Sequence, residues 1–219
     1  MNDARDNNPD TPPAVNRRVL LVDDSPQIHE DYRRCLAAAV AASELDAMES
    51  ALFGGGTGTG GGSGGGGGAA VAGRPPFEID SALQGEAAAD MVRAAVAAGR
   101  PYALAFVDMR MPPGWDGLQT IEAIWALDPR VQVVICTAYS DYSWDEIVAR
   151  LGRTDRLLIL RKPFDKVEVC QLAEALTEKW SLALAAGRRQ EELEALVRQR
   201  TDQLEQALRQ DRLRLDLLE

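Results

Sequence analysis

The feature of this sequence that most constrains its fold is a regular alternation of short apolar segments with longer helical patterns. Residues 18–23 form a continuous apolar run that ends in an acid, which is typical of a strand buried on both faces of a parallel sheet. Alternation of such strands with helices predicts an α/β domain, with a doubly wound five-stranded parallel sheet and helices on both faces. The predicted strands are 18–23, 77–81, 102–108, 131–137 and 157–160, and the predicted helices are about 26–52, 85–98, 117–127, 143–151 and a segment from 165 onward.

Composition narrows the class of protein. Hydrophobic residues make up 46% of the chain and charged residues 26%, as in ordinary soluble globular proteins. The net charge of −10, without a cluster of Lys and Arg, argues against a general nucleic-acid binder. No apolar run approaches the ~18 residues that span a bilayer, and the N-terminus lacks the apolar core of a signal peptide. We therefore expect a cytoplasmic protein without a nucleic-acid or membrane partner, in which Cys35, Cys136 and Cys170 are reduced structural thiols.

Two segments are not expected to join the core. Residues 1–16 are polar and predict a disordered tail. Residues 54–74 begin with a run of glycine broken only by two threonines and one serine, and such a run cannot bury enough surface to offset its ordering entropy. A phosphate-binding loop is the alternative, but that loop needs a preceding strand and usually a lysine, and neither is present. We interpret residues 54–74 as a flexible insertion in a domain that spans residues 17–180.

The C-terminal segment, residues 181–219, predicts a coiled-coil linker. Its composition shifts to Arg, Glu, Gln and Leu, and apolar residues recur mostly at spacings of 3 and 4. The alternative is a single surface helix packed on its own domain. The helical pattern continues to Glu219 without a stop signal, so we expect a further domain beyond this residue. The apolar seam residues are Leu193, Val197, Leu204, Leu208, Leu215 and Leu218, with Thr201 and Asp211 at intervening seam positions.

Polar residues follow or end four of the predicted strands. Asp23 and Asp24 come at the end of the first, Asp108 ends the third, Thr137 ends the fourth, and Lys162 follows the fifth. Ligands bind at this edge of open α/β sheets. Three carboxylates there would repel one another and need cations, and oxygen ligands favour Mg²⁺. The acids could instead simply cap helices, but capping does not explain Thr137 and Lys162 together.

Over roughly residues 17–180 the sequence resembles the response-regulator receiver family of two-component signalling. The order and spacing of four motifs carry the resemblance. These are Val-Leu-Leu-Val-Asp23-Asp24-Ser-Pro, Phe-Val-Asp108-Met-Arg-Met-Pro followed by Asp116-Gly117, Val-Ile-Cys-Thr137-Ala138, and Leu-Arg-Lys162-Pro163-Phe164. The resemblance implies a flavodoxin-like sheet in the order 2-1-3-4-5.

The resemblance also implies roles for the site residues. Asp108 would accept the phosphoryl group, Asp24 would bind Mg²⁺ directly, Asp23 would bind it through water, and the backbone carbonyl of Arg110 would complete the protein ligands.

At the same site the resemblance assigns two contacts to the phosphoryl group. Lys162 would pair with the phosphoryl oxygens, and the Thr137 hydroxyl would turn inward to the same group. In this family the bond corresponding to Lys162–Pro163 is usually cis, which would direct the lysine into the site. The chain would not be an enzyme in the usual sense, apart from Mg²⁺-dependent phosphorylation and dephosphorylation of itself.

The implied partner is a histidine kinase or a phosphotransfer protein. Phosphorylation would then be relayed through the helix from 165 into the coiled coil, with a homodimer formed through the 181–219 helix and through the face made by 143–151, 157–160 and the helix from 165. Similar receivers precede a diguanylate cyclase, a cyclic-di-GMP phosphodiesterase or a histidine kinase domain. Two alternatives stay open, a phosphorylation-independent dimerisation scaffold and a flavodoxin-type cofactor binder, although Asp23 and Asp24 would repel the phosphate of a flavin.

The sequence departs from the family pattern at several positions. Ile159 stands where many receivers have an aromatic switch residue, and Tyr139 or Tyr142 could take its place. The loop before Gly117 is one residue longer than usual, and it leaves Trp115 exposed or folded over the site. His29 is the only histidine, and we interpret it as an ordinary surface residue.

Overall fold

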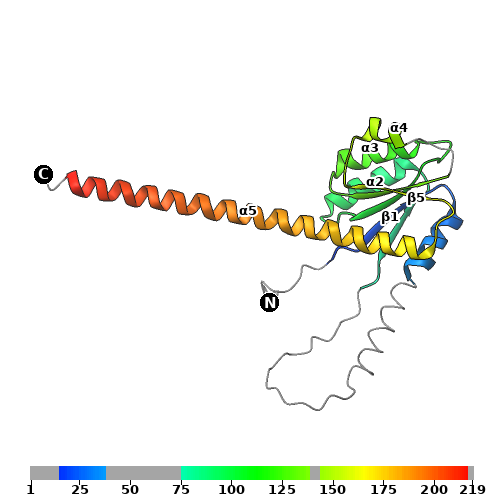
Figure 1. The fold of residues 1–219 in the computed structure, drawn as a ribbon, viewed down its shortest axis with the longest axis horizontal. Helices are drawn as coiled ribbons and strands as arrows, with labels where there is room; N and C mark the ends of the chain where they lie inside the picture. The colour runs from blue at the N-terminus through cyan, green and yellow to red at the C-terminus, as the bar shows by residue number, and fades with distance from the viewer. Residues whose placement is uncertain (1–14, 38–74, 139–143, 217–219) are drawn as a thin grey trace, which may run out of the picture. The chain divides into compact units, whose positions relative to one another are not determined.

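The computed structural model describes residues 15–37, 75–138 and 144–216. The predicted tail lies almost wholly outside these ranges, as do the insertion over 54–74, Tyr139 and Tyr142. The five strands are β1 (Arg18–Val22), β2 (Glu78–Ala82), β3 (Leu104–Asp108), β4 (Gln132–Thr137) and β5 (Leu157–Arg161). They form one parallel sheet in the order β2-β1-β3-β4-β5 (Figure 1), which confirms the predicted fold class.

Helices alternate with the strands as the sequence predicted. A first helix covers residues 26–37, and the part of its predicted range beyond residue 37 lies outside the described residues. The other helices are α2 (Gly85–Ala97), α3 (Gly117–Leu127), α4 (Trp144–Leu151) and α5 (Lys166–Asp216). Each begins within one residue of its predicted start. The part of the chain that the structure describes has no helix both apolar and long enough to cross a bilayer.

The core has two apolar layers, one on each face of the sheet. Residues of β3 alternate between them, because successive side chains of a strand point to opposite faces. Ala105 and Val107 pack in the layer that α2, α3 and α4 cover, whereas Leu104 and Phe106 pack in the layer beneath the 26–37 helix and the first turns of α5. Figure 1 shows the helices on the two faces. Helices on both faces leave the carboxyl ends of the strands as one continuous edge.

α3 begins close to the end of β3. Asp116 caps the helix, because its side chain accepts a hydrogen bond from the backbone amide of Gln119 and the Gln119 side chain accepts one from the amide of Asp116. The next residue, Gly117, donates its backbone amide to the carbonyl of Met109 at 3.0 Å. A Cβ atom on Gly117 would lie 2.5 Å from the backbone oxygen of Asp108. Glycine is therefore required for α3 to approach the backbone of Asp108 this closely.

α5 takes part in two different environments. Val15–Trp180 form one compact unit, and residues from Ser181 to Glu219 belong to another. Within the first unit, Val169, Ala173, Leu176 and Trp180 are buried at the spacings of 4 and 3 that place residues on one helix face. Gly187 does not interrupt the helix. From Ala186 to Arg209, every side chain that the structure describes is exposed.

Replacing Gly117 with alanine should destabilise the Val15–Trp180 unit. The added methyl group would meet the backbone of Asp108 and Met109, and overpacking of this kind costs about 1–3 kcal/mol. Gly187→Ala is the matched control, because nothing lies within 4 Å of its added Cβ, and alanine favours an exposed helix by about 0.5–1 kcal/mol. Thermal and urea unfolding followed by circular dichroism would measure both. Equal stability of Gly117→Ala and wild type would contradict this account of the close approach.

Candidate functional site

Four strands bring their polar residues to one edge of the sheet. Asp23 directly follows β1, Asp108 ends β3, Thr137 ends β4 and Lys162 directly follows β5. Because all the strands are parallel, their carboxyl ends lie on the same side. The backbone amide of Lys162 also donates to the carbonyl of Thr137 at 2.9 Å, so pairing between β4 and β5 continues up to the site.

The Lys162 ammonium joins two carboxylates from different strands. Its Nζ atom lies 2.8 Å from Oδ2 of Asp23 and 2.7 Å from Oδ1 of Asp108. The exposed fraction is only 6% for the Asp23 side chain and 12% for that of Asp108, against 25% for Lys162. The Lys162–Pro163 bond is cis, as the family resemblance implied. Buried Asp23 and half-buried Asp108 thus share one cation, which leaves a net negative charge.

Each of these carboxylates also accepts a backbone amide. Oδ1 of Asp23 accepts from Ser25 at 2.9 Å, and Oδ2 of Asp108 accepts from Arg110 at 3.1 Å. Hydrogen bonds of this kind stabilise the charged form of an acid. They also fix the direction of each carboxylate before any ligand binds.

The electrostatic balance of the site is unfavourable to the charge on Asp108. Burial raises the pKa of Asp108 above its usual range, and the charge of Asp23 raises it further, although Lys162 and the amide of Arg110 oppose the change. Burial alone would lower the pKa of Lys162, but hydrogen bonds and charge from Asp108 and Asp23 outweigh burial and raise it. Lys162 is therefore fully charged near neutral pH, and Asp108 still lacks compensating positive charge.

Asp24 differs from its neighbour because its side chain is exposed. Within residues 15–37, 75–138 and 144–216, no three or more His, Cys, Asp or Glu side chains are gathered so that they could hold a metal ion. The expected convergence of three carboxylates is thus only partly present, because Lys162 links Asp23 and Asp108 without Asp24.

The residues at this edge nevertheless suit Mg²⁺. Magnesium usually keeps several waters and takes one or two carboxylates plus phosphate oxygens, rather than a complete protein cage. The candidate metal ligands at this edge are oxygen atoms, and the single charge of Lys162 does not balance the two charges of Asp23 and Asp108. Asp24, Asp108 and the carbonyl of Arg110 could hold the ion at the exposed rim.

Thr137 lies at the same edge but is engaged locally. It is 8% exposed, and its hydroxyl donates to the carbonyl of Ala138 at 2.9 Å. Turning this hydroxyl toward a group on Asp108 would require a rotation about its Cα–Cβ bond. The segment that follows, residues 139–143, lies outside the described residues.

The interpretation of His29 as a surface residue is wrong. Its side chain is 2% exposed, and its Nε2 atom lies 2.7 Å from the backbone oxygen of Asp23. The signal for this burial was present in the sequence, because His29 shares a spacing of 3 and 4 with Tyr32 and Leu36, which are also buried. Because histidine is a polar residue type, His29 was not counted as part of the buried face that Tyr32 and Leu36 form.

A buried aromatic group lies beneath the acidic residues. The Tyr32 ring is 4.9 Å from the rings of both Phe106 and Phe164, and its hydroxyl lies 2.8 Å from Sγ of Cys136. Burial raises the pKa of Tyr32 far above its usual range and the pKa of Cys136 to about 12. Both groups are therefore neutral. This arrangement agrees with the expectation of a structural thiol at Cys136, which is free and buried.

The loop between β3 and α3 forms an open hollow of about 470 Å³ beside the site. Trp115 is half-buried there, which lies between the fully exposed position and the position folded over the site that were expected from the sequence. Ile159 packs against the core layer of α2 and α3. An aliphatic side chain therefore occupies the position at which the family pattern has an aromatic switch residue. The hollow is lined by Met109, Arg110, Met111, Pro112, Gly114, Trp115 and Asp116.

Several solved structures share this fold. An adenylate cyclase from Rhodopirellula baltica aligns with a TM-score of 0.54 at 17% identity, over 81% of this chain and 98% of its own. A signal receiver domain from Vibrio parahaemolyticus aligns with a TM-score of 0.51 at 17% identity, over 78% and 98%. NtrX from Brucella abortus aligns with a TM-score of 0.50 at 19% identity, over 80% of this chain and 29% of its own. At these identities the likeness shows the fold alone.

Sequence comparison gives the family. None of the curated proteins compared with the chain matches it. Residues 70–174 match the response regulator receiver domain. This match covers β2 to the first turns of α5, and the parallel sheet in the order β2-β1-β3-β4-β5 agrees with it. The chain therefore carries a receiver domain of the response regulator family.

Proposed function

We propose that this receiver domain accepts a phosphoryl group on Asp108 from a histidine kinase or a phosphotransfer protein, in a reaction that depends on Mg²⁺. The observation that carries the proposal is the Lys162 ammonium, which lies within 2.8 Å of both Asp23 and Asp108. A carboxylate with a fixed direction and a cation beside it is what in-line phosphoryl transfer requires.

The chain's own residues divide the work of the reaction. An oxygen of Asp108 would form the bond to phosphorus while the bond from phosphorus to the donor histidine nitrogen breaks. Lys162 lies 2.7 Å from Asp108 Oδ1 and would follow the negative charge onto the phosphoryl oxygens. The hydroxyl of Thr137 would exchange its bond to Ala138 for a bond to the same group. Asp24, Asp108 and the Arg110 carbonyl would hold Mg²⁺, which supplies positive charge to the transferring oxygens.

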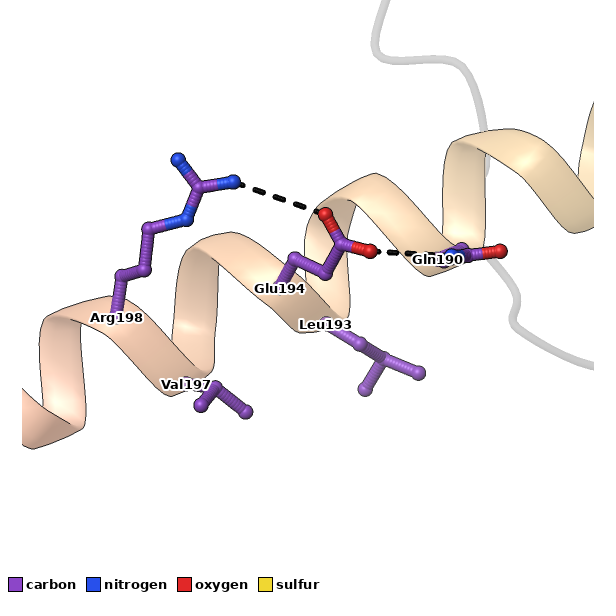
Figure 2. A pocket seen from close by; sticks show the side chains of 5 residues that line it. All are labelled: Gln190, Leu193, Glu194, Val197 and Arg198. Atoms are coloured by element: carbon purple, nitrogen blue, oxygen red, sulfur yellow. Dashed lines mark hydrogen bonds and ion pairs between the residues drawn. The ribbon is translucent and has the colours of Figure 1, made fainter.

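We further propose that the segment 181–219 pairs with a second copy of itself. Leu193 and Val197 lie on the same side of the helix in Figure 2, away from the polar row in which Glu194 contacts Gln190 and Arg198. These five residues line a shallow hollow of about 420 Å³. The next seam residues, Leu204 and Leu208, are 65% and 68% exposed. Helix pairing would remove this apolar stripe from water.

The first unit offers a second surface for the same dimer. Three elements each leave one large apolar side chain exposed, namely Trp144 of α4, Leu158 of β5 and Val167 of α5. Phosphorylation of Asp108 adds negative charge at the carboxyl end of the sheet. We propose that this charge is relayed through Thr137 and α5 to the pairing of the 181–219 segment. In this proposal the receiver is a signalling module, and any output activity belongs to the domain or partner protein that the receiver regulates.

Phosphorylation itself is the direct test. Wild-type protein incubated with Mg²⁺ and a small phosphodonor such as phosphoramidate should gain the mass of one phosphoryl group. Asp108→Asn should gain none, because an amide cannot form the acyl phosphate. Asp90→Asn, at an exposed acid of α2, is the matched control and should react like wild type. Modification of Asp108→Asn to the wild-type extent would refute the assignment. Dimerisation without any labelling of wild type would favour a phosphorylation-independent scaffold.

The raised pKa of Asp108 predicts that this acid lowers stability in metal-free buffer. A folded-state pKa above the unfolded value means that stability is lost as pH rises through it. Asp108→Asn should therefore melt at a higher temperature than wild type at pH 7, and the difference should vanish toward the ordinary aspartate pKa of about 4. Asp90→Asn should show no such difference. A lower melting temperature for Asp108→Asn at pH 7 without metal would contradict the charge balance described above.

A charge placed in the apolar stripe should disrupt the dimer. Leu204→Glu should shift sedimentation at micromolar concentration toward the monomer, because like charges would face each other across the seam. Gln199→Glu adds the same charge at an exposed position off the stripe and should leave the oligomeric state unchanged. The idea of self-pairing fails if wild type sediments as a monomer both with and without phosphorylation.

A further inference from the structure

The backbone and side chain of Asp23 have all four of their polar atoms bonded. Its amide donates to the carbonyl of Ala82 at 3.2 Å, and its Oδ1 accepts from the amide of Ser25 at 2.9 Å. Its Oδ2 accepts from Lys162 at 2.8 Å, and its carbonyl oxygen lies 2.7 Å from Nε2 of His29. The four partners come from β2, the turn after β1, the end of β5 and the 26–37 helix. Asp23 is therefore held from every side.

The contact with His29 has only one chemical sense. A backbone carbonyl can only accept, so Nε2 of His29 must carry the proton and donate it. The imidazole is 2% exposed, and a buried polar ring costs free energy unless it is hydrogen-bonded. An apolar side chain would pack equally well on this helix face, beside Tyr32 and Leu36. The bond to Asp23 is what distinguishes histidine from such a residue.

The bonded carbonyl belongs to the peptide unit that links Asp23 to Asp24. A peptide unit is planar, so holding its oxygen also fixes the orientation of the next amide and the position of the next Cα atom. The side chain of Asp24 is exposed, and burial therefore does little to direct it. The direction of the Asp24 carboxylate accordingly depends on the orientation of the Asp23–Asp24 peptide.

We propose that His29 is a positioning residue for the cation site. By donating to the Asp23 carbonyl from the buried side, it fixes the peptide from which Asp24 extends toward the metal. This inference rests on the proposed function, because it takes Asp24 as a ligand of Mg²⁺. It goes further in giving a metal-orienting role to the only histidine of the chain, which does not contact the ion itself. Groups that orient metal ligands commonly change metal affinity by about 10–100-fold when they are removed.

The test compares variants that keep or remove the donor. His29→Phe fills the space without a donor and should weaken Mg²⁺ binding by about tenfold. His29→Gln can place an amide N–H where Nε2 lies and should retain most of the affinity, whereas His29→Asn is too short to do so. The measurement is a Mg²⁺ titration followed by amide chemical shifts in two-dimensional NMR, with thermal unfolding recorded for each variant.

A purely structural role predicts a different pattern. Leu36→Val shortens a fully buried side chain of the same helix and should lower the midpoint temperature of thermal unfolding without changing Mg²⁺ affinity. If His29→Phe binds Mg²⁺ as tightly as wild type, the inference is wrong. If His29→Phe does not fold, the comparison of Gln with Asn decides, and equal affinities of those two variants would overturn it.

The two proposals fail in different ways. If wild type shows no Mg²⁺-dependent shifts near Asp24 and Asp108, the proposed function itself is wrong. If wild type binds Mg²⁺ and is phosphorylated while all His29 variants bind equally, only the role of His29 is lost.

Discussion

The rest of the site depends on one ammonium group shared by a buried and a half-buried carboxylate. Lys162 follows β5, Asp23 follows β1 and Asp108 ends β3, so the pair of contacts joins strands that are not all neighbours in the sheet. A single positive charge cannot balance two acids that are largely removed from water. The sheet holds these groups together in spite of their repulsion. The remaining negative charge at its edge favours binding of a cation or protonation of Asp108.

This imbalance connects stability with function. The raised pKa of Asp108 means that its charged form is disfavoured where it lies, yet the proposed function needs that charged form to attack phosphorus. An unfavourable local charge balance of this kind is common at functional sites. The folding free energy that it costs is offset by favourable interactions elsewhere in the protein. Here the compensation comes from two dense apolar layers and from local devices such as the Asp116 cap and the close approach of Gly117.

α5 shows how one helix can serve two environments through its sequence pattern. Near its start, Val169, Ala173 and Leu176 give one buried face against the sheet. Beyond Gly187 the apolar residues are fewer and all of those described are exposed. A helix is stabilised mainly by packing of its apolar face. The exposed stripe of Leu193, Val197, Leu204 and Leu208 is the surface that the proposed pairing with a second copy would cover.

The sequence by itself determined the α/β class and the polar positions at the strand ends. It also determined the bounds of the five strands and of α2, α3 and α4 to within two residues, because strand and helix periodicity and the residues at element ends are local properties. Only the tertiary structure decided which polar atoms meet. It joined Lys162 to Asp23 and Asp108 but left Asp24 exposed, since consecutive residues leave the backbone in different directions. It also placed the carbonyl of Asp23 where it accepts from the ring of His29. The spacing of His29 with Tyr32 and Leu36 indicated a buried helix face, but no pattern of residue types reveals such an acceptor.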